Sequence, residues 1–404
     1  MLKRLLGAQW LAIGIVGAVS FVLSIFVARQ LGPEAFGVYA QAVSLGALLS
    51  ILIDGGFGKL LMRETVRVSP SLETHGEFLH RYAYGHALSV MAVLAFLVVV
   101  NPLAPHWPTL LATVGAFGAV VLANFSMAIL RGQGRLMRDA LWQIGGRLLT
   151  AFFVIVALWF GAGSPWVILV AQCVGTFVFL IILMRRGWIA PKLRIPRAVY
   201  ATALPLVWLE LATVAYFRAD MLLFETAGVP KADIGSYGVA FRLIEAFLLL
   251  ASPVGLLLFR RFRLDSGVTT DAVLRQVMRF AAFAGAIGLL VFFAAQPLAD
   301  MFFQTVFGKG FALSADCFRI LSLMLVFALA NGVLGQGVLA LGSERFYAWT
   351  ATVAAIVNIL GNLVLMPEYG VWAAAWMTVI TEAVLSVGLS GALFGAWKKC
   401  RYAK

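Results

Sequence analysis

The chain has 404 residues, of which 62% are hydrophobic and 12% charged, and its formal net charge is +13. This apolar fraction exceeds what a water-exposed surface accommodates, which excludes a soluble multidomain protein. The cations are spread over many connectors instead of one folded face, so the charge indicates membrane topology and attraction to anionic lipid, with no nucleic-acid partner.

Twelve apolar stretches of about 17 to 25 residues follow one another along the chain, each long enough to cross the hydrocarbon core as a helix. We therefore predict an all-α polytopic membrane protein with about 12 transmembrane helices. The expected spans are roughly 8–28, 38–57, 82–100, 109–130, 140–160, 166–184, 203–224, 234–258, 278–298, 314–340, 347–366 and 370–395.

Lysine and arginine fall in alternate connectors between these spans. Of the 31, 24 share a side with both termini, four lie within spans, and Arg29, Lys231 and Lys309 lie on the opposite side. Because cationic loops stay in the cytoplasm, both termini are predicted to be cytoplasmic.

Two passages of the sequence repeat one another. Gly37 and Tyr39 recur as Gly235 and Tyr237, and an Ala and a Leu follow at the same offset. Each passage opens an even-numbered span after a proline-containing loop, which indicates two parallel six-helix repeats. We predict bundles at 1–184 and 203–404, joined by a cytoplasmic linker at 185–202 that lies along the lipid surface.

Five ionisable side chains stand deep in the second half. Ionisable groups in a spanning helix cost at least a few kcal/mol each, so they usually face a partner or a water-filled cavity. Arg242 and Glu245 are three residues apart and can pair on one helix face. Asp220 and Arg242 have similar depths if their helices are neighbours. The five are Glu210, Arg218 and Asp220 in the seventh span and Arg242 and Glu245 in the eighth.

These charges suit an anionic ligand. Arg242 and Arg218 would supply a fixed positive field, and guanidinium groups bind phosphate well because they stay charged and offer planar donors. Asp220 and Glu245 would hold or release a cation. A buried structural ion-pair network without any ligand is the alternative interpretation.

Two further spans contain weaker candidates. Arg147 in the fifth span is a candidate cavity residue that could instead snorkel to the interface. Glu382, near the middle of the twelfth span, is either a proton site or a hydrogen-bonded carboxyl, and Glu210 joins it as an ion-coupling or counter-ion candidate. Asp54 is expected to end a helix at the cytoplasmic border.

Several motifs are absent from the sequence. It has no GxxxxGK[ST] phosphate loop, no HExxH and no GxSxG, and its cysteines and histidines form no ligand spacing. We therefore expect no ATPase, no metal, no cofactor and no enzyme activity.

Five passages of the sequence are similar to those of a known family. They are VARQLGPEAFGVYA at 27–40, IDGGFG at 53–58, MRE at 62–64, RADMLL at 218–223 and IGSYGVAFRLIE at 234–245. These passages resemble the bacterial oligosaccharide flippases, which are the O-antigen and polysaccharide transporters of the multidrug/oligosaccharidyl-lipid/polysaccharide superfamily.

The resemblance implies two six-helix bundles around a central cavity in the bacterial inner membrane. Alternating access would carry an undecaprenyl-diphosphate-linked oligosaccharide to the outer leaflet for O-antigen or lipopolysaccharide assembly, driven by an H⁺ or Na⁺ gradient. Arg242 and Arg218 would meet the diphosphate or acidic sugars, with Asp220 and Glu245 as counter-ions or coupling sites. Other polysaccharide-assembly membrane proteins are candidate partners.

Two rival functions remain open. A drug or cation antiporter of the same superfamily should favour an acidic cavity, whereas this chain has arginines beside its deep carboxylates. A membrane glycosyltransferase, polymerase or ligase should present acidic motifs in a sizeable outer loop, and the expected outer loops have none.

Overall fold

The computed structural model describes residues 2–66, 73–101, 106–184, 190–265 and 270–402, so residues 185–189 of the expected linker lie outside it. The regular elements in these ranges are helices, which confirms the predicted all-α class. They are α1 (Leu2–Asp54), α2 (Phe57–Val66), α3 (Glu73–Val99), α4 (Trp107–Gly132), α5 (Leu136–Trp159), α6 (Pro165–Met184), α7 (Arg197–Thr226), α8 (Lys231–Asp265), α9 (Thr270–Val306), a short 3₁₀ turn (Lys309–Phe311), α10 (Ala312–Ala340), α11 (Glu344–Tyr369) and α12 (Val371–Tyr402).

Ten of these helices are long and apolar enough to cross a membrane, counted over the described residues. The first of them contains two of the predicted spans, because Gly32 has φ 71° and breaks α1 just before Pro33. At about 1.5 Å per residue a straight helix of this length would be more than twice the hydrocarbon thickness, so α1 folds back at Gly32. Helix α7 covers the expected seventh span.

The chain forms two compact units, Met1–Arg218 and Ala219–Lys404, here called unit 1 and unit 2. Their boundary falls inside α7, whereas the sequence predicted a linker at 185–202. The first half of α7 belongs with unit 1 because it packs on α2 and α3, as the contacts of Tyr200 with Phe57 and His86 show. The assignment of 1–184 and 203–404 as two six-helix repeats remains a prediction.

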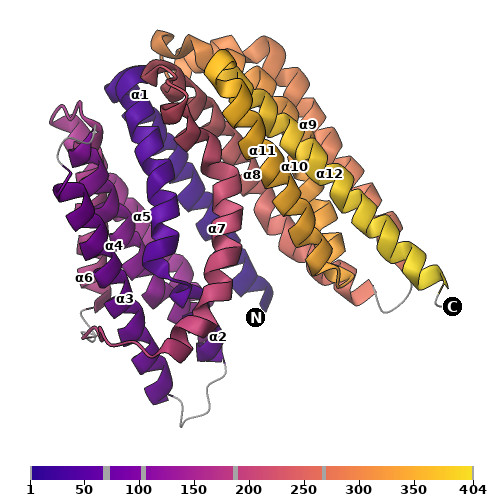
Figure 1. Ribbon diagram of the computed structural model, residues 1–404, viewed down its shortest axis with the longest axis horizontal. Helices are drawn as coiled ribbons and strands as arrows, with labels where there is room; N and C mark the ends of the chain where they lie inside the picture. Colours follow the sequence, from indigo (N-terminus) through magenta and orange to yellow (C-terminus); the bar gives the residue numbers. More distant parts are fainter. Residues whose placement is uncertain (1, 67–72, 102–105, 185–189, 266–269, 403–404) are drawn as a thin grey trace. The chain divides into compact units, whose positions relative to one another are not determined.

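Each unit is built around one central helix (Figure 1). In unit 1, α4 packs against α1, α3 and α6, and in unit 2, α10 packs against α8, α9 and α12. Helices α4 and α10 cover the fourth and tenth predicted spans, and their neighbours also correspond in order. This matching arrangement supports an internal repeat of six spans.

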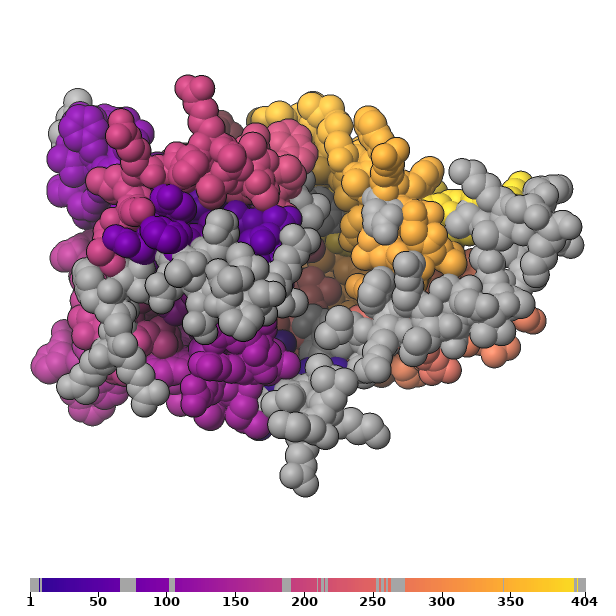
Figure 2. Space-filling view, turned by 90° about the horizontal axis from the view of Figure 1, so that it is seen from below, coloured from indigo at the N-terminus to yellow at the C-terminus, as the bar shows by residue number. Residues whose placement is uncertain are grey.

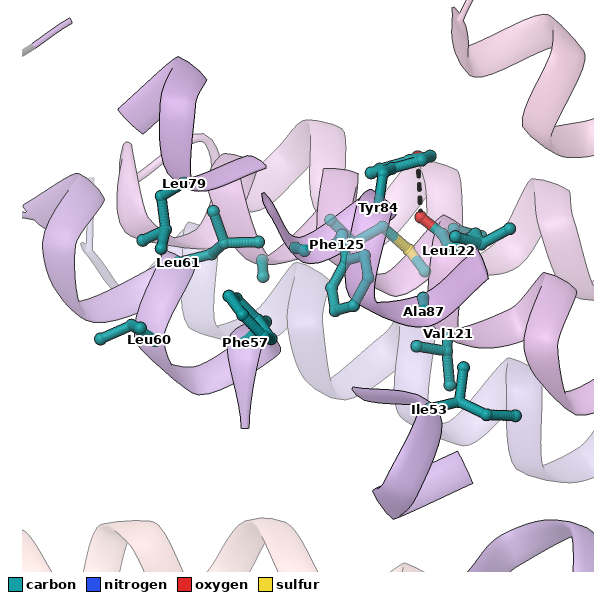
Figure 3. Close-up of a cluster of buried hydrophobic side chains, with 14 of the residues drawn as sticks. Ile53, Phe57, Leu60, Leu61, Leu79, Tyr84, Ala87, Val121, Leu122 and Phe125 are labelled. Atoms are coloured by element: carbon teal, nitrogen blue, oxygen red, sulfur yellow. Dashed lines mark hydrogen bonds between the residues drawn. The ribbon is translucent and has the colours of Figure 1, made fainter. Parts of the chain in front are cut away.

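The core of unit 1 is apolar and continuous from α1 to α4 (Figure 3). Ile53, Phe57 and Phe125 are completely buried, and the Tyr84 hydroxyl donates to the Leu122 carbonyl at 3.0 Å. Leu60 and Leu79 lie toward one end of this cluster in Figure 3, where the short helix α2 meets α3. The cluster holds α2 firmly against the spanning helices.

Candidate substrate and ion sites

Arg242 and Glu245 on α8 form the ion pair that their spacing predicted. Arg242 Nη1 lies 2.9 Å from Glu245 Oε2, and the two side chains are 28% and 26% exposed. Both are therefore partly accessible although the helix is apolar enough to span the membrane. A guanidinium that keeps its charge and is not sealed by protein can bind an anion if the carboxylate moves aside.

Asp220 has a partner that the sequence did not reveal. The carboxylate is buried near the end of α7 and accepts a short hydrogen bond from the Tyr237 hydroxyl on α8. It also accepts from the backbone N–H of Met221 at 2.8 Å. Tyr237 is itself completely buried, so Asp220 is held inside unit 2 at the α7–α8 contact.

Tyr237 is also a repeat position, since Tyr39 stands at the same place in the first half. Tyr39 is buried as well, and its hydroxyl accepts a hydrogen bond from Gln172 Nε2 at 2.7 Å. The two tyrosines thus bind polar side chains in both units, but only the second faces a carboxylate. Unit 2 thus has a buried carboxyl group, that of Asp220, next to the repeated tyrosine.

Glu382 is buried in unit 2 between α12 and α10. Asn331 donates to its carboxylate at 2.7 Å and to its backbone carbonyl at 2.9 Å. Ser386 in turn donates to Asn331 Oδ1 at 2.6 Å. Glu382 is therefore a buried, hydrogen-bonded carboxyl group, and its role as a proton site remains a prediction.

A second buried polar group adjoins Glu382 along α12, and the sequence reasoning missed it. Asn358 donates to the Thr381 hydroxyl at 3.2 Å, and Asn362 donates to Asn358 Oδ1 at 3.1 Å. Asn362 Oδ1 is buried without a hydrogen-bond partner among the described residues. Two asparagines four residues apart in an apolar span were the available signal, because such amides must pair inside the helix bundle.

Glu210 lies in unit 1 and pairs with a cation on α2. Lys59 Nζ on α2 is 2.9 Å from Glu210 Oε1 on α7. The contact is possible because α7 approaches the turn between α1 and α2 closely. Glu210 therefore has a fixed counter-ion, and its role as an ion-coupling residue remains a prediction.

The turn between α1 and α2 uses the residues Asp54 to Gly58. As expected, α1 ends at Asp54, and its carboxylate accepts from the Gly58 N–H at 3.2 Å. Gly55 and Gly56 have φ of 57° and 77°, which favour glycine. A Cβ on Gly56 would lie 2.6 Å from the Ala203 carbonyl oxygen, so glycine is also needed for the approach of α7.

Arg218 and Arg147 are both partly buried and both belong to unit 1, Arg218 as its last residue. Arg242, in contrast, belongs to unit 2. The described contacts pair Arg242 with Glu245, and they give Asp220, Glu210 and Glu382 partners that the sequence did not predict. Whether the three arginines act on one ligand remains a prediction.

Asp139 is the buried charge that sequence reasoning overlooked. It is 0% exposed at the start of α5. Its carboxylate accepts from Arg131 Nε at 3.1 Å, Gln9 Nε2 at 2.9 Å and Gln143 Nε2 at 2.7 Å. The available signal was one acid next to the arginines of the α4–α5 connector, which we counted for topology alone.

Comparisons with known proteins agree with this architecture. Residues 5–261 match the polysaccharide biosynthesis protein family. Over 388 residues the chain is 20% identical to a protein of Haloferax volcanii described as the probable low-salt glycan biosynthesis flippase Agl15, covering 90% of this chain and 77% of that protein.

Solved structures share the fold at low sequence identity. The lipid II flippase MurJ in its inward closed conformation has a TM-score of 0.76 and 13% identity, over 98% of this chain and 90% of that one. An inward-facing multidrug resistance MATE family transporter of the MOP superfamily has a TM-score of 0.60 and 13% identity, over 98% and 94%. The chain therefore has the fold of these multi-pass membrane proteins.

Proposed function

The chain belongs to the polysaccharide biosynthesis protein family, and from this premise we propose that it is a flippase for a lipid-linked oligosaccharide. It would carry an undecaprenyl-diphosphate-linked glycan from the inner to the outer leaflet of the bacterial cytoplasmic membrane by alternating access. The glycan would serve O-antigen or other surface polysaccharide assembly, and both termini would lie in the cytoplasm. The likeness to Agl15 and the fold shared with MurJ support this proposal.

The observation that carries the proposal is the partly exposed Arg242–Glu245 pair on a spanning helix. A permanent positive charge is costly in such a segment unless it has a use or a partner. A diphosphate would replace Glu245 as the partner of Arg242 through charge-assisted, bidentate hydrogen bonds. Arg218 and Arg147 would add positive charge for the same group or for acidic sugars.

The same charges argue against the drug or cation antiporter. A cationic drug would need a negative cavity, whereas each arginine candidate makes the potential more positive. The fold shared with MATE transporters does not decide between these functions, because the lipid II flippase has it too. A transport assay with organic cations separates the two.

We further propose that Asp220 and Glu382 couple transport to an ion gradient. Both carboxyl groups are buried in unit 2 and accept hydrogen bonds from neutral donors, the Tyr237 hydroxyl and the Asn331 amide, so each offers a polar site for a proton or a cation inside a spanning segment. Asp220→Asn and Glu382→Gln should therefore abolish gradient-driven transport. In proteoliposomes, the ion is identified by whether an imposed H⁺ or Na⁺ gradient drives transport by the wild type. Undiminished gradient-driven transport in both variants contradicts the assignment.

The decisive test uses a strain that lacks the gene. We expect lipid-linked repeat units to accumulate on the cytoplasmic leaflet, and the wild-type gene to clear them. Arg242→Ala should fail to clear them, because the diphosphate loses a charge-assisted contact of about 1.5–3 kcal/mol, which lowers productive binding at least tenfold. The measurement is the amount of lipid-linked glycan that a membrane-impermeant glycan-cleaving enzyme digests only after the membrane is opened.

The matched control is Arg279→Ala, an exposed arginine on α9 of the same unit. It should clear the intermediate as the wild type does, at equal membrane expression. Normal surface polysaccharide in the Arg242→Ala strain would refute the assigned role of Arg242. A deletion strain without any trapped intermediate would refute the flippase itself.

A further inference from the structure

Unit 1 has an open groove that the proposed transport path does not use. Its volume is about 540 Å³, and it lies between α2, α3 and the first turns of α7. Leu60, Phe78, Tyr82 and Val199 contribute apolar surface to its walls, and Glu64 is the charged residue among them, paired with Arg63 at 2.9 Å. This size is in the range of small-molecule sites.

The groove is continuous with the core of unit 1. Leu60 and Leu79 belong both to its lining and to the buried cluster of Figure 3, and Tyr82 and Val199 pack against that cluster. The walls are therefore fixed by the fold. An apolar surface of this kind binds hydrocarbon in preference to water.

A segment of chain before α7, residues 190–196, rests on α3 and contributes Pro196 to the lining of the groove. Arg81 Nε donates to the Ala190 carbonyl and the Lys192 N–H donates to the Arg81 carbonyl, both at 2.9 Å. The backbones are so close that a Cβ on Gly85 would be 2.0 Å from the Lys192 carbonyl oxygen. Figure 2, seen from below, shows residues near 200 beside residues near 60.

The same segment supplies a cationic rim. Lys192 Nζ lies 4.4 Å from the centre of the Phe78 ring, which lines the groove, and 5.8 Å from that of Tyr82. Arg194 and Arg197 are exposed next to it, while Leu193 between the cations is 72% exposed. Alternating cations and exposed apolar side chains are typical of a segment at the lipid interface.

We propose that this groove holds an acyl chain of an anionic phospholipid, with the lipid phosphate bound by Lys192 and Arg197. The apolar walls match the chain and the cationic rim matches the headgroup. The chain spans a membrane, so lipid reaches the open groove laterally. This lipid is a resident of unit 1 and is distinct from the cargo assigned to the deep arginines.

The test is photo-crosslinking of the full-length protein in phosphatidylcholine vesicles. A small fraction of the lipid is phosphatidylglycerol with a photoactivatable acyl chain, and labelled peptides are mapped. We expect label in α2, in the first turns of α3 around Phe78, and at 196–202. Ala198→Trp, which fills the groove from its exposed α7 side, should abolish the label.

Lys192→Ala should lower the labelling roughly fivefold, since one cation near a membrane surface is worth about a factor of that size. Arg138→Ala is the matched control, because Arg138 is an exposed cation away from the groove, and it should label as the wild type does. Size-exclusion profiles confirm that each variant is folded, and Val199→Phe replaces Ala198→Trp if that variant is not.

Two outcomes would overturn the proposal. Equal labelling by photoactivatable phosphatidylcholine would show that the cationic rim selects nothing. Labelling by a photoactivatable prenyl phosphate but not by phosphatidylglycerol would assign the groove to cargo. Neither readout depends on transport, so a failure here is distinguishable from failure of the flippase.

Discussion

At the scale of single residues, Asp139 joins three helices of unit 1. Its carboxylate accepts from Gln9 on α1, Arg131 on α4 and Gln143 on its own helix α5. Gln9 also donates to the Leu136 carbonyl at 2.7 Å, so it binds the α5 start twice. Asp139 is therefore the acceptor that fastens the beginning of α1 to the α4–α5 connector.

Asp139→Ala should lower the stability of unit 1. The substitution removes an acceptor from Arg131, Gln9 and Gln143, which costs roughly 1–3 kcal/mol, because Arg131 is 38% exposed and regains water as a partner. Asp139→Asn keeps the size and one acceptor oxygen and should cost less. Thermal unfolding in detergent, followed by fluorescence, measures both.

Glu34→Ala is the control for this series, because Glu34 is an exposed carboxylate on α1. It should leave the unfolding temperature within error of the wild type. If Asp139→Ala behaved like Glu34→Ala, the cluster would contribute nothing to stability.

The sequence predicted residue contacts only where they are local. Arg242 and Glu245 are one helical turn apart, so their pairing follows from the helix period. Asp139 and Gln9, and likewise Glu382 and Asn331, are brought together by tertiary packing across many residues. No local pattern shows such a partner, which is why the buried hydrogen-bonded carboxylates were underestimated.

At the scale of elements, the turn between α1 and α2 is built on backbone geometry. Gly55 and Gly56 allow positive φ and leave room for the α7 backbone and for His86, whose Nε2 lies 2.9 Å from the Leu52 carbonyl oxygen. The spanning helices could be predicted from the length of the apolar stretches in the sequence. The amphipathic helix α2 could not be predicted in this way, because it is too short to span the membrane and its polar residues resemble those of a loop.

Gly56→Ala should destabilise the protein by roughly 1–3 kcal/mol, since the new Cβ meets a backbone oxygen at a strained φ. Gly14→Ala is the matched control, because a Cβ at that helical position meets no atom within 4 Å. Thermal unfolding in detergent should separate the two variants. Equal unfolding temperatures would mean that α7 can move away from the turn without cost.

At the scale of the whole molecule, the spacing of apolar stretches predicted the membrane fold correctly, while the unit boundary fell elsewhere. The predicted linker begins where the apolar sequence stops, but the compact unit continues to Arg218. Composition changes at the membrane surface, whereas the boundary depends on which helices α7 packs against. Apolar patterning cannot report that packing.

The orientation can be tested directly with single cysteines after Cys173, Cys317 and Cys400 are replaced by serine. Lys309→Cys should react with an impermeant maleimide in intact cells, because it is exposed on the side predicted to face outwards. Arg135→Cys, exposed in the α4–α5 connector, should react only after the membrane is opened. The reverse pattern would invert the predicted topology.

The break of α1 at Gly32 has a practical consequence for tools that bind the side predicted to face outwards. One residue reverses the chain there, so the two halves of α1 are joined without a loop that an antibody or a protease could bind, or into which an epitope tag could be inserted. An insertion at that point would push apart a tight helical hairpin. The turns at Gly161 and Gly308 are better places for a tag on the predicted outer side, because each glycine already has a positive φ outside a helix.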